Sequence, residues 1–106
     1  MIPESRIPTH PGEILLEEFL KPMDVTQVRF AHHIRVSVQR INKIVNGKRG
    51  VTPETAWLFA QALGTTPEFW MNLQANHDLA QSREKLLAVL AKAPDVEPEE
   101  ADRLPA

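Results

Sequence analysis

The chain has 106 residues, of which 42 % are hydrophobic and 25 % are charged, values typical of one globular domain. The absence of cysteine excludes disulfides, thiol chemistry and thiolate metal sites, and the formal net charge is −2. That charge is unevenly distributed. The segment 25–53 contains six basic residues and no acidic residue, whereas the rest of the chain contains six basic and fourteen acidic residues. Since polyanion binding needs only a local basic surface, the composition permits a nucleic-acid partner.

The amino-terminal residues contain no apolar stretch, and no apolar run approaches the roughly 20 residues of a membrane-spanning helix. We therefore expect neither a signal peptide nor membrane association, and a cytoplasmic location. The four glycines are not clustered, so they provide no phosphate-binding loop, and no catalytic triad or metal-ligand set is recognisable. We expect no cofactor and no enzymatic activity.

Helix start and stop signals divide the chain into five predicted helices. Threonine and serine are favoured N-caps, proline is favoured in the first turn, and glycine or asparagine tolerates the backbone that ends a helix. In chain order, these signals are Pro11, Pro22, Thr26, Ser37, Asn46, Gly47, Thr52, Pro53, Gly64, Thr66 and Pro67. The helices that they predict cover residues 13–20, 27–34, 38–45, 53–63 and 67–90. The polar segment 76–82 permits a break in the fifth helix, which otherwise continues past Leu90.

No segment shows the alternating pattern of a β-strand, so we predict an all-α fold of five helices in one domain, residues 1–93. The remaining residues, 94–106, include three prolines and five acidic residues and have little to bury. We expect them to form a flexible acidic tail.

Residues 27–46 have the pattern of a helix-turn-helix, in which two short helices cross at a steep angle. Such a pair needs a small residue where the two backbones meet, and Ala31 supplies it. It also needs apolar residues that are buried on both helices. These are Phe30, Ile34, Val36, Ile41 and Ile44. We therefore predict a helix-turn-helix formed by the second and third helices.

If those residues are buried, the outer face of helix 38–45 presents side chains that suit base edges in a DNA major groove. Asparagine and glutamine suit adenine, arginine and lysine suit guanine, and valine suits the thymine methyl group. The candidate contacts on this face are Ser37, Val38, Gln39, Arg40, Asn42 and Lys43. Asn46, Lys48 and Arg49 follow directly, where phosphates flank the groove. The rival interpretation is that the basic segment is only a solvated surface.

Several motifs between residues 7 and 80 match the pattern of one known family. They are Pro8-Thr-His-Pro-Gly-Glu-Ile-Leu, Thr26-Gln27, Gln39-Arg-Ile-Asn, Val45-Asn-Gly-Lys-Arg49, Thr52-Pro-Glu-Thr-Ala and Ala62-Leu-Gly-Thr-Thr-Pro-Glu-Phe-Trp-Met-Asn-Leu-Gln. On these motifs the chain resembles the HigA-type antitoxins, also described as virulence-associated protein I homologues, within the Xre or phage-repressor helix-turn-helix superfamily. The resemblance implies a five-helix fold like that of lambda repressor.

The resemblance also implies a type II antitoxin, which neutralises a HigB-type mRNA-cleaving toxin and, as a homodimer, represses its own operon by binding double-stranded operator DNA. By residue-to-residue match, Gln27 contacts phosphate. The implied base contacts are Val38, Gln39 and Lys43, and the implied backbone contacts are Ser37, Arg40, Asn46 and Lys48. Two alternatives stay open. One is a stand-alone repressor without a toxin, and the other is a helical protein-interaction module that has lost DNA binding.

Arg35 departs from the superfamily pattern, which commonly has glycine at this position of the turn. If the turn keeps a left-handed backbone, Arg35 costs about 1 kcal/mol of stability. The alternative is a turn of slightly different shape. Neither outcome abolishes the fold, but each affects the tilt of helix 38–45.

Two other sets of residues are expected to be structural. His32 and His33 are neighbours on a helix and do not face each other, so we interpret them as surface histidines rather than metal ligands. The aromatic cluster of the fourth and fifth helices is expected to form their core rather than a ligand pocket. Its members are Trp57, Phe59, Phe69, Trp70 and Met71.

An apolar stripe on the fifth helix is expected to be either core or a dimer interface. It comprises Trp70, Leu73, Leu79, Leu86 and Leu90. A dimer is expected because repressors of this kind bind paired half-sites about 34 Å apart. The acidic residues 95–102 either remain solvated, mask a basic toxin or compete with DNA for the basic segment.

Overall fold

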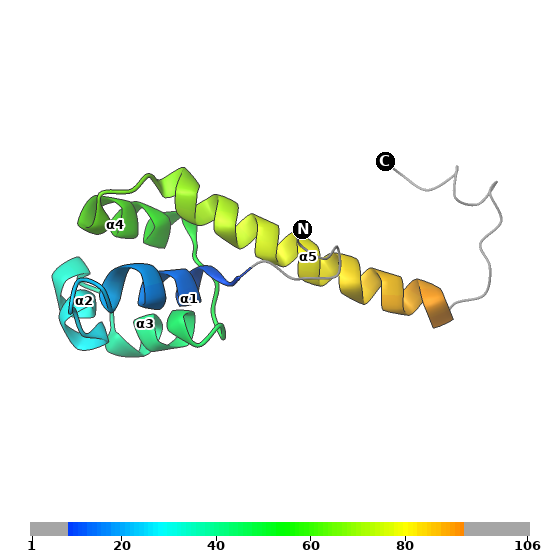
Figure 1. The fold of residues 1–106 in the computed structure, drawn as a ribbon, viewed down its shortest axis with the longest axis horizontal. Helices are drawn as coiled ribbons and strands as arrows, with labels where there is room; N and C mark the ends of the chain where they lie inside the picture. Colours follow the sequence, from blue (N-terminus) through cyan, green and yellow to red (C-terminus); the bar gives the residue numbers. More distant parts are fainter. Residues whose placement is uncertain (1–8, 93–106) are drawn as a thin grey trace.

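The computed structural model describes residues 9–92, and within this range the chain is helical and forms no strand (Figure 1). The helices are α1 (Pro11–Ile14), its π-helical continuation η1 (Leu15–Leu20), α2 (Gln27–Ile34), α3 (Val38–Val45), α4 (Pro53–Leu63) and α5 (Pro67–Lys92). The predicted all-α fold is confirmed, and the bounds of α2, α3 and α4 are those predicted. The predicted acidic tail, 94–106, and its boundary with the domain lie outside the described residues.

The helix starts follow from local capping. The hydroxyl groups of Thr26, Ser37, Thr52 and Thr66 each accept a hydrogen bond from the backbone N–H three residues later, at 3.1–3.3 Å. Only the first helix begins earlier than predicted. It starts at Pro11 because the Nδ1 atom of His10 accepts the Gly12 N–H at 2.9 Å and so caps the helix.

The core is built around two aromatic side chains, Trp70 and Phe59, which are fully buried. Their ring centroids are 5.1 Å apart, and Phe59 also contacts Phe30 at 5.5 Å. The indole N–H of Trp70 donates to the Thr65 hydroxyl at 2.7 Å, so the buried ring leaves no unsatisfied donor. The apolar residues of the predicted helix-turn-helix join this core, with Ala31 fully buried and Val36 only half-buried.

The prediction that the whole aromatic cluster is core is wrong for Trp57, whose side chain is 66 % exposed. Helix α4 buries Thr55, Ala56, Phe59 and Ala60, which leaves position 57 on its outer face. Phe69 is also partly exposed, although its ring packs against Phe19 and Trp70. Met71 is half-buried.

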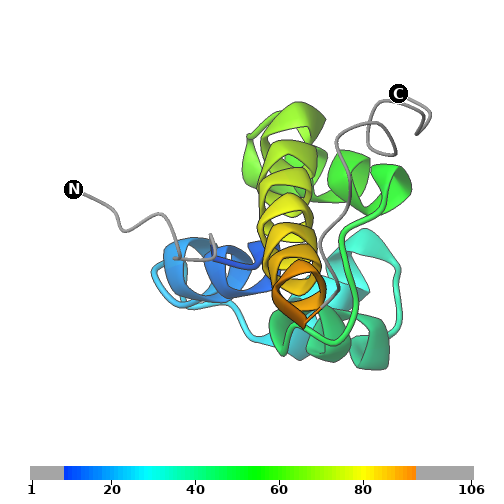
Figure 2. The ribbon, with the colours of Figure 1, turned by 90° about the vertical axis from the view of Figure 1, so that its right-hand side faces the viewer.

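Helix α5 is continuous through 76–82, so the break that this segment permits is absent. Its first half contacts α1 and α4. These two helices lie on opposite sides of α5 when the molecule is seen from the carboxyl end of α5 (Figure 2). The second half extends beyond the other helices (Figure 1), and every residue from Gln81 to Ala91 is exposed. The predicted stripe is therefore divided: Trp70 belongs to the core, whereas Leu79, Leu86 and Leu90 are exposed.

None of the helices in the described range is both long and apolar enough to span a lipid bilayer.

The turn between α2 and α3 keeps the left-handed backbone. Arg35 has φ 61° and ψ 42°, close to the values of 72° and 27° at Gly64, which ends α4. In both turns the residue's own N–H donates to a carbonyl in the last turn of the helix before it. Arg35 thus occupies a conformation that favours glycine, at a cost of about 1 kcal/mol.

These two helix ends form a matched pair for a stability measurement. Gly64→Ala is expected to lower the free energy of unfolding by about 1 kcal/mol. No atom lies within 4 Å of the added Cβ, so the loss reports the backbone alone. Arg35→Gly is expected to be neutral or to stabilise by less than about 1 kcal/mol, because the flexibility of glycine in the unfolded chain offsets part of the gain. Urea denaturation measures both, and a loss at Arg35→Gly equal to that at Gly64→Ala contradicts the strain argument.

Candidate nucleic-acid interface

Helix α3 has one buried side and one exposed side. Ile41 and Ile44 are fully buried, whereas Gln39, Asn42 and Lys43 are exposed. The helix lies along one edge of the bundle, and α4 lies at the opposite edge (Figure 1). The exposed side of α3 is therefore free of the other helices and can enter a groove.

The carboxyl end of α3 is held by the start of α1. A Cβ atom at Gly12 would overlap the carbonyl oxygen of Ile44, so only glycine allows this approach. After α3 the chain folds back on the helix. The backbone N–H groups of Lys48 and Arg49 both donate to the carbonyl of Lys43, at 2.8 and 3.2 Å. We call residues 46–49 the α3 loop. It brings its cations beside the last turn of α3.

A chain of side-chain amides crosses the exposed surface. Asn42 Nδ2 donates to Gln27 Oε1 at 3.4 Å, and Asn46 Nδ2 donates to Asn42 Oδ1 at 3.2 Å. These bonds join the first residue of α2 to the middle of α3 and to the α3 loop. Exposed bonds of this kind contribute little to stability, but they orient the amides. Asn42 is thus engaged within the protein on both sides.

The ten predicted DNA contacts differ in exposure. Seven are exposed, namely Ser37, Gln39, Asn42, Lys43, Asn46, Lys48 and Arg49. The remaining three, Gln27, Val38 and Arg40, are half-buried. Val38 packs partly against the core, and the Nε atom of Arg40 is buried without a hydrogen-bond partner among the described residues. The prediction that Val38 and Arg40 lie fully on the outer face therefore holds only in part, because both are at the edge of the buried side.

The cations of segment 25–53 have no acidic partners among the residues that the structure describes. None of them forms an ion pair within residues 9–92, where Lys21 and Glu17, outside the segment, do so at 2.8 Å. Unpaired surface cations attract phosphates, which bind with release of counterions. The interface thus combines polar side chains on a protruding helix with flanking positive charge.

A family model described as helix-turn-helix matches residues 16–70. The chain belongs to the helix-turn-helix family. Two curated relatives are 41 % identical to it. They are virulence-associated protein I of Dichelobacter nodosus, over 75 residues that cover 71 % of this chain and 69 % of the relative, and antitoxin HigA-1 of Vibrio cholerae, over 82 residues that cover 76 % of each.

A solved structure of Pseudomonas aeruginosa antitoxin HigA with the higBA promoter is also similar, with a TM-score of 0.76 and 34 % identity. The match covers 86 % of this chain and 97 % of that one. The predicted resemblance to HigA-type antitoxins is confirmed.

In this helix-turn-helix protein, two residues near the interface escaped the sequence analysis as functional candidates. Gln74 of α5 is buried; its Oε1 accepts the Val51 N–H at 2.7 Å and its Nε2 donates to Asp78 at 2.9 Å. It thereby anchors the chain between α3 and α4. The second is His10, whose ring contacts that of His77, with centroids 4.9 Å apart. In the sequence, Gln74 is a polar residue among the apolar positions of α5, and this pattern could have indicated a buried polar group.

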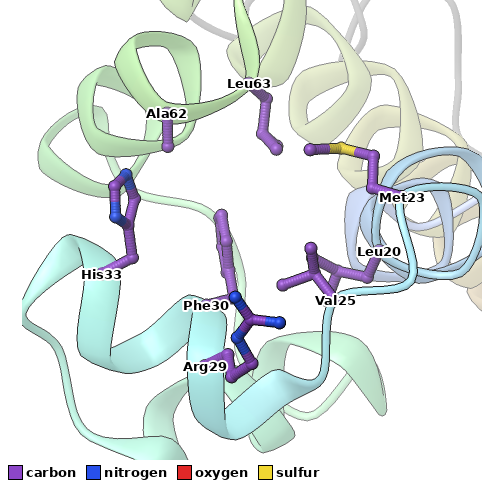
Figure 3. Close-up of a pocket in the computed structure, with 8 residues that line it drawn as sticks. All are labelled: Leu20, Met23, Val25, Arg29, Phe30, His33, Ala62 and Leu63. Carbon is purple, nitrogen blue, oxygen red and sulfur yellow. The ribbon is translucent and has the colours of Figure 1, made fainter.

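The protein also has a small apolar pocket between η1, α2 and α4 (Figure 3). Its lining residues are Leu20, Met23, Val25, Arg29, Phe30, His33, Ala62 and Leu63. The volume is about 220 Å³, below the range of about 300–1,000 Å³ that is usual for ligand sites. None of the predicted DNA contacts lines it, so it does not compete with α3 as the candidate site.

The described residues contain no group of three or more histidine, aspartate or glutamate side chains placed to hold a metal ion. His32 and His33 are both exposed, as expected of surface histidines.

Proposed function

We propose that this protein is a DNA-binding antitoxin that represses its own operon. The observation that carries the proposal is the exposed polar side of α3, flanked by cations that form no ion pair within residues 9–92. The relationship to HigA antitoxins, one of them solved with its promoter, supports the same function. Helix α3 enters the major groove of the operator, and the protein acts in the cytoplasm by binding rather than by catalysis.

The proposed DNA contacts fall into two classes, those to base edges and those to the phosphate backbone. Gln39 and Lys43 are exposed on α3 and contact base edges, whereas Val38 offers a methyl group to thymine. The remaining candidates hold the phosphate backbone on both sides of the groove; they are Gln27, Ser37, Arg40, Asn46, Lys48 and Arg49. Asn42 is tied to Gln27 and Asn46, so we assign it mainly to the orientation of these neighbours.

A homodimer is the second part of the proposal, and the outer half of α5 is its interface. Leu79, Leu86, Val89 and Leu90 are between 51 % and 68 % exposed there. A helical segment as short as the one from Leu79 to Lys92 is only marginally stable by itself in water, so a partner surface that buries these side chains would stabilise it. Two copies joined through α5 present two α3 helices to paired half-sites.

The third part is a toxin partner. HigA antitoxins give the expectation that this chain neutralises a HigB-type ribonuclease, which distinguishes it from a stand-alone repressor. The gene next to that of this chain provides the test. We expect it to encode a short basic ribonuclease-like protein whose toxicity is relieved by co-expression and which co-purifies with this chain. A neighbouring gene of another kind favours the stand-alone repressor.

Substitutions on α3 and in the α3 loop are expected to act differently on DNA binding. Gln39→Ala should cost about 1–3 kcal/mol of binding free energy, confined to one base-pair position. Lys48→Ala should weaken binding to all sequences about equally and reduce the slope of log affinity against log salt by about 1. Titrations of the operator, of its single-base variants and of random DNA at several salt concentrations measure both effects.

Lys21→Ala is the matched control, because this lysine is exposed but lies outside the basic segment. It should leave DNA binding unchanged. Equal affinity of the unmodified protein for operator and random DNA would refute sequence-specific binding, whereas a failure to bind DNA at low salt would favour the protein-interaction module.

The dimer is tested by placing charge on the exposed stripe. The double variant Leu86→Glu, Leu90→Glu should be monomeric in sedimentation equilibrium and should bind the two-half-site operator about 100-fold more weakly, because the two half-sites are no longer linked. Both side chains are exposed within the chain, so the helical bundle should stay folded. Gln81→Glu adds a charge to the same half of α5 without removing an apolar side chain and should remain dimeric. If the double variant keeps the molecular mass of the parent protein, the interface lies elsewhere.

A further inference from the structure

His10 lies where three parts of the chain meet. Its Nδ1 atom caps α1 by accepting the Gly12 N–H at 2.9 Å. A Cβ atom built on Gly47 would be 3.9 Å from Cγ of His10, so the α3 loop lies beside the ring with room for about one further carbon atom between them. The ring also contacts that of His77 of α5 in a T-shaped arrangement, with centroids 4.9 Å apart. One imidazole therefore contacts the start of α1 and α5 and lies beside the α3 loop.

We propose that His10 is a positioning residue for the α3 loop and that protonation of its ring weakens operator binding. The inference rests on the proposed DNA-binding function and adds a regulation by pH to it. His10 itself contacts no DNA in this proposal. It acts through Gly12, which lies against the end of α3, and through its position beside Gly47 in the loop that carries Asn46 and Lys48.

The hydrogen bond to Gly12 requires the neutral ring. A neutral imidazole has one nitrogen that accepts, whereas in the imidazolium both nitrogens donate. Protonation therefore removes the cap of α1. It also places a positive charge at the positive end of the helix dipole, where a cation is unfavourable. Because Gly12 lies directly against the Ile44 carbonyl, a change at the start of α1 is transmitted to the end of α3.

The surroundings of His10 favour the neutral ring. Burial lowers the pKa of His10, the neighbouring His77 lowers it further, and Asp78 opposes both by raising it. The other charged groups close in the chain, Glu13 on α1 and Lys48 beside Gly47, are exposed to solvent. With a pKa below that of the unfolded chain, the contribution of His10 is complete above the usual histidine pKa and is lost as the pH falls through the lowered value.

The sign of the effect on DNA binding separates two explanations. A positive charge near phosphates would by itself strengthen binding on acidification. Loss of the cap, with the displacement of α1 and of the end of α3 that follows from it, would weaken binding. A fall in operator affinity at low pH that depends on His10 therefore identifies the positioning role, and a rise identifies a simple charge effect.

The experiment compares the parent protein with His10→Asn, whose amide oxygen can accept the Gly12 N–H but which does not titrate. Operator affinity is measured at constant salt between about pH 7.5 and about pH 5, on both sides of the usual histidine pKa. The parent protein should lose about five-fold more affinity over this range than His10→Asn, the factor that corresponds to a lost N-cap. His10→Ala, which lacks the acceptor, should bind weakly at both ends of the range.

Two further variants test the named neighbours. His77→Asn should move the midpoint of the pH dependence to higher pH, and Asp78→Asn should move it to lower pH, because these residues shift the pKa of His10 in opposite directions. His33→Asn is the control for histidines in general, since His33 is exposed on α2 and should leave the profile unchanged.

Nuclear magnetic resonance of the free protein makes the result independent of DNA. The ring signals of His10 should titrate together with the amide signals of Gly12 and Gly47. The protection factor of the Gly12 amide, which compares its exchange rate with that of an unfolded chain at the same pH, should fall at low pH. If the parent protein and His10→Asn show the same pH profile, or if His10 titrates without any change at Gly47, the proposal is overturned. If the protein binds no operator at any pH, the proposed function fails, while these amide signals still decide whether His10 holds the loop.

Discussion

The position of α3 depends on the approach of Gly12 to the carbonyl of Ile44. At this point α1 touches the last turn of α3 with no space for a side-chain atom. The contact fixes the end of α3 from one side, while the buried Ile41 and Ile44 fix the helix against the core. A helix of eight residues has little stability of its own, so tertiary contacts of this kind decide its orientation. The exposed side of α3 is therefore presented by the domain as a whole.

Helix α5 links this local arrangement to assembly. Its buried half carries Gln74, which holds Val51, and His77, which contacts His10, so it fastens both the chain after α3 and the start of α1. Its outer half carries the exposed leucines of the proposed dimer interface. Because the helix is continuous between these halves, a dimer formed at the outer half would set the relative orientation of two α3 helices. One element would thus couple oligomeric state to the spacing of half-sites.

The parts of this structure that depend on local chemistry follow from the sequence. Hydroxyl caps, prolines and glycines mark the ends of α2, α3 and α4, and the spacing of Phe30, Ile41 and Ile44 identifies the buried side of the helix-turn-helix. The errors concern residues whose surroundings come from distant parts of the chain. Trp57 is a large aromatic residue of the kind expected in a core, but it faces outward because the smaller Ala56 and Ala60 occupy the buried side of α4. The contact of His10 with His77 joins positions 67 residues apart, and no local pattern indicates it.

Specificity and affinity are assigned to different groups of this interface. In the proposed complex, the cations of segment 25–53, which form no ion pair within residues 9–92, attract any duplex, so they contribute affinity without selecting a sequence. The hydrogen bonds from Gln27 through Asn42 to Asn46 occupy amide groups that could otherwise contact bases, and they join α2 to the α3 loop. In the proposed complex, sequence selection is then left to a few side chains, chiefly Gln39 and Lys43. Arg35 fits this division, since a cation at a position that favours glycine gives up a little stability and adds charge beside the amino end of α3.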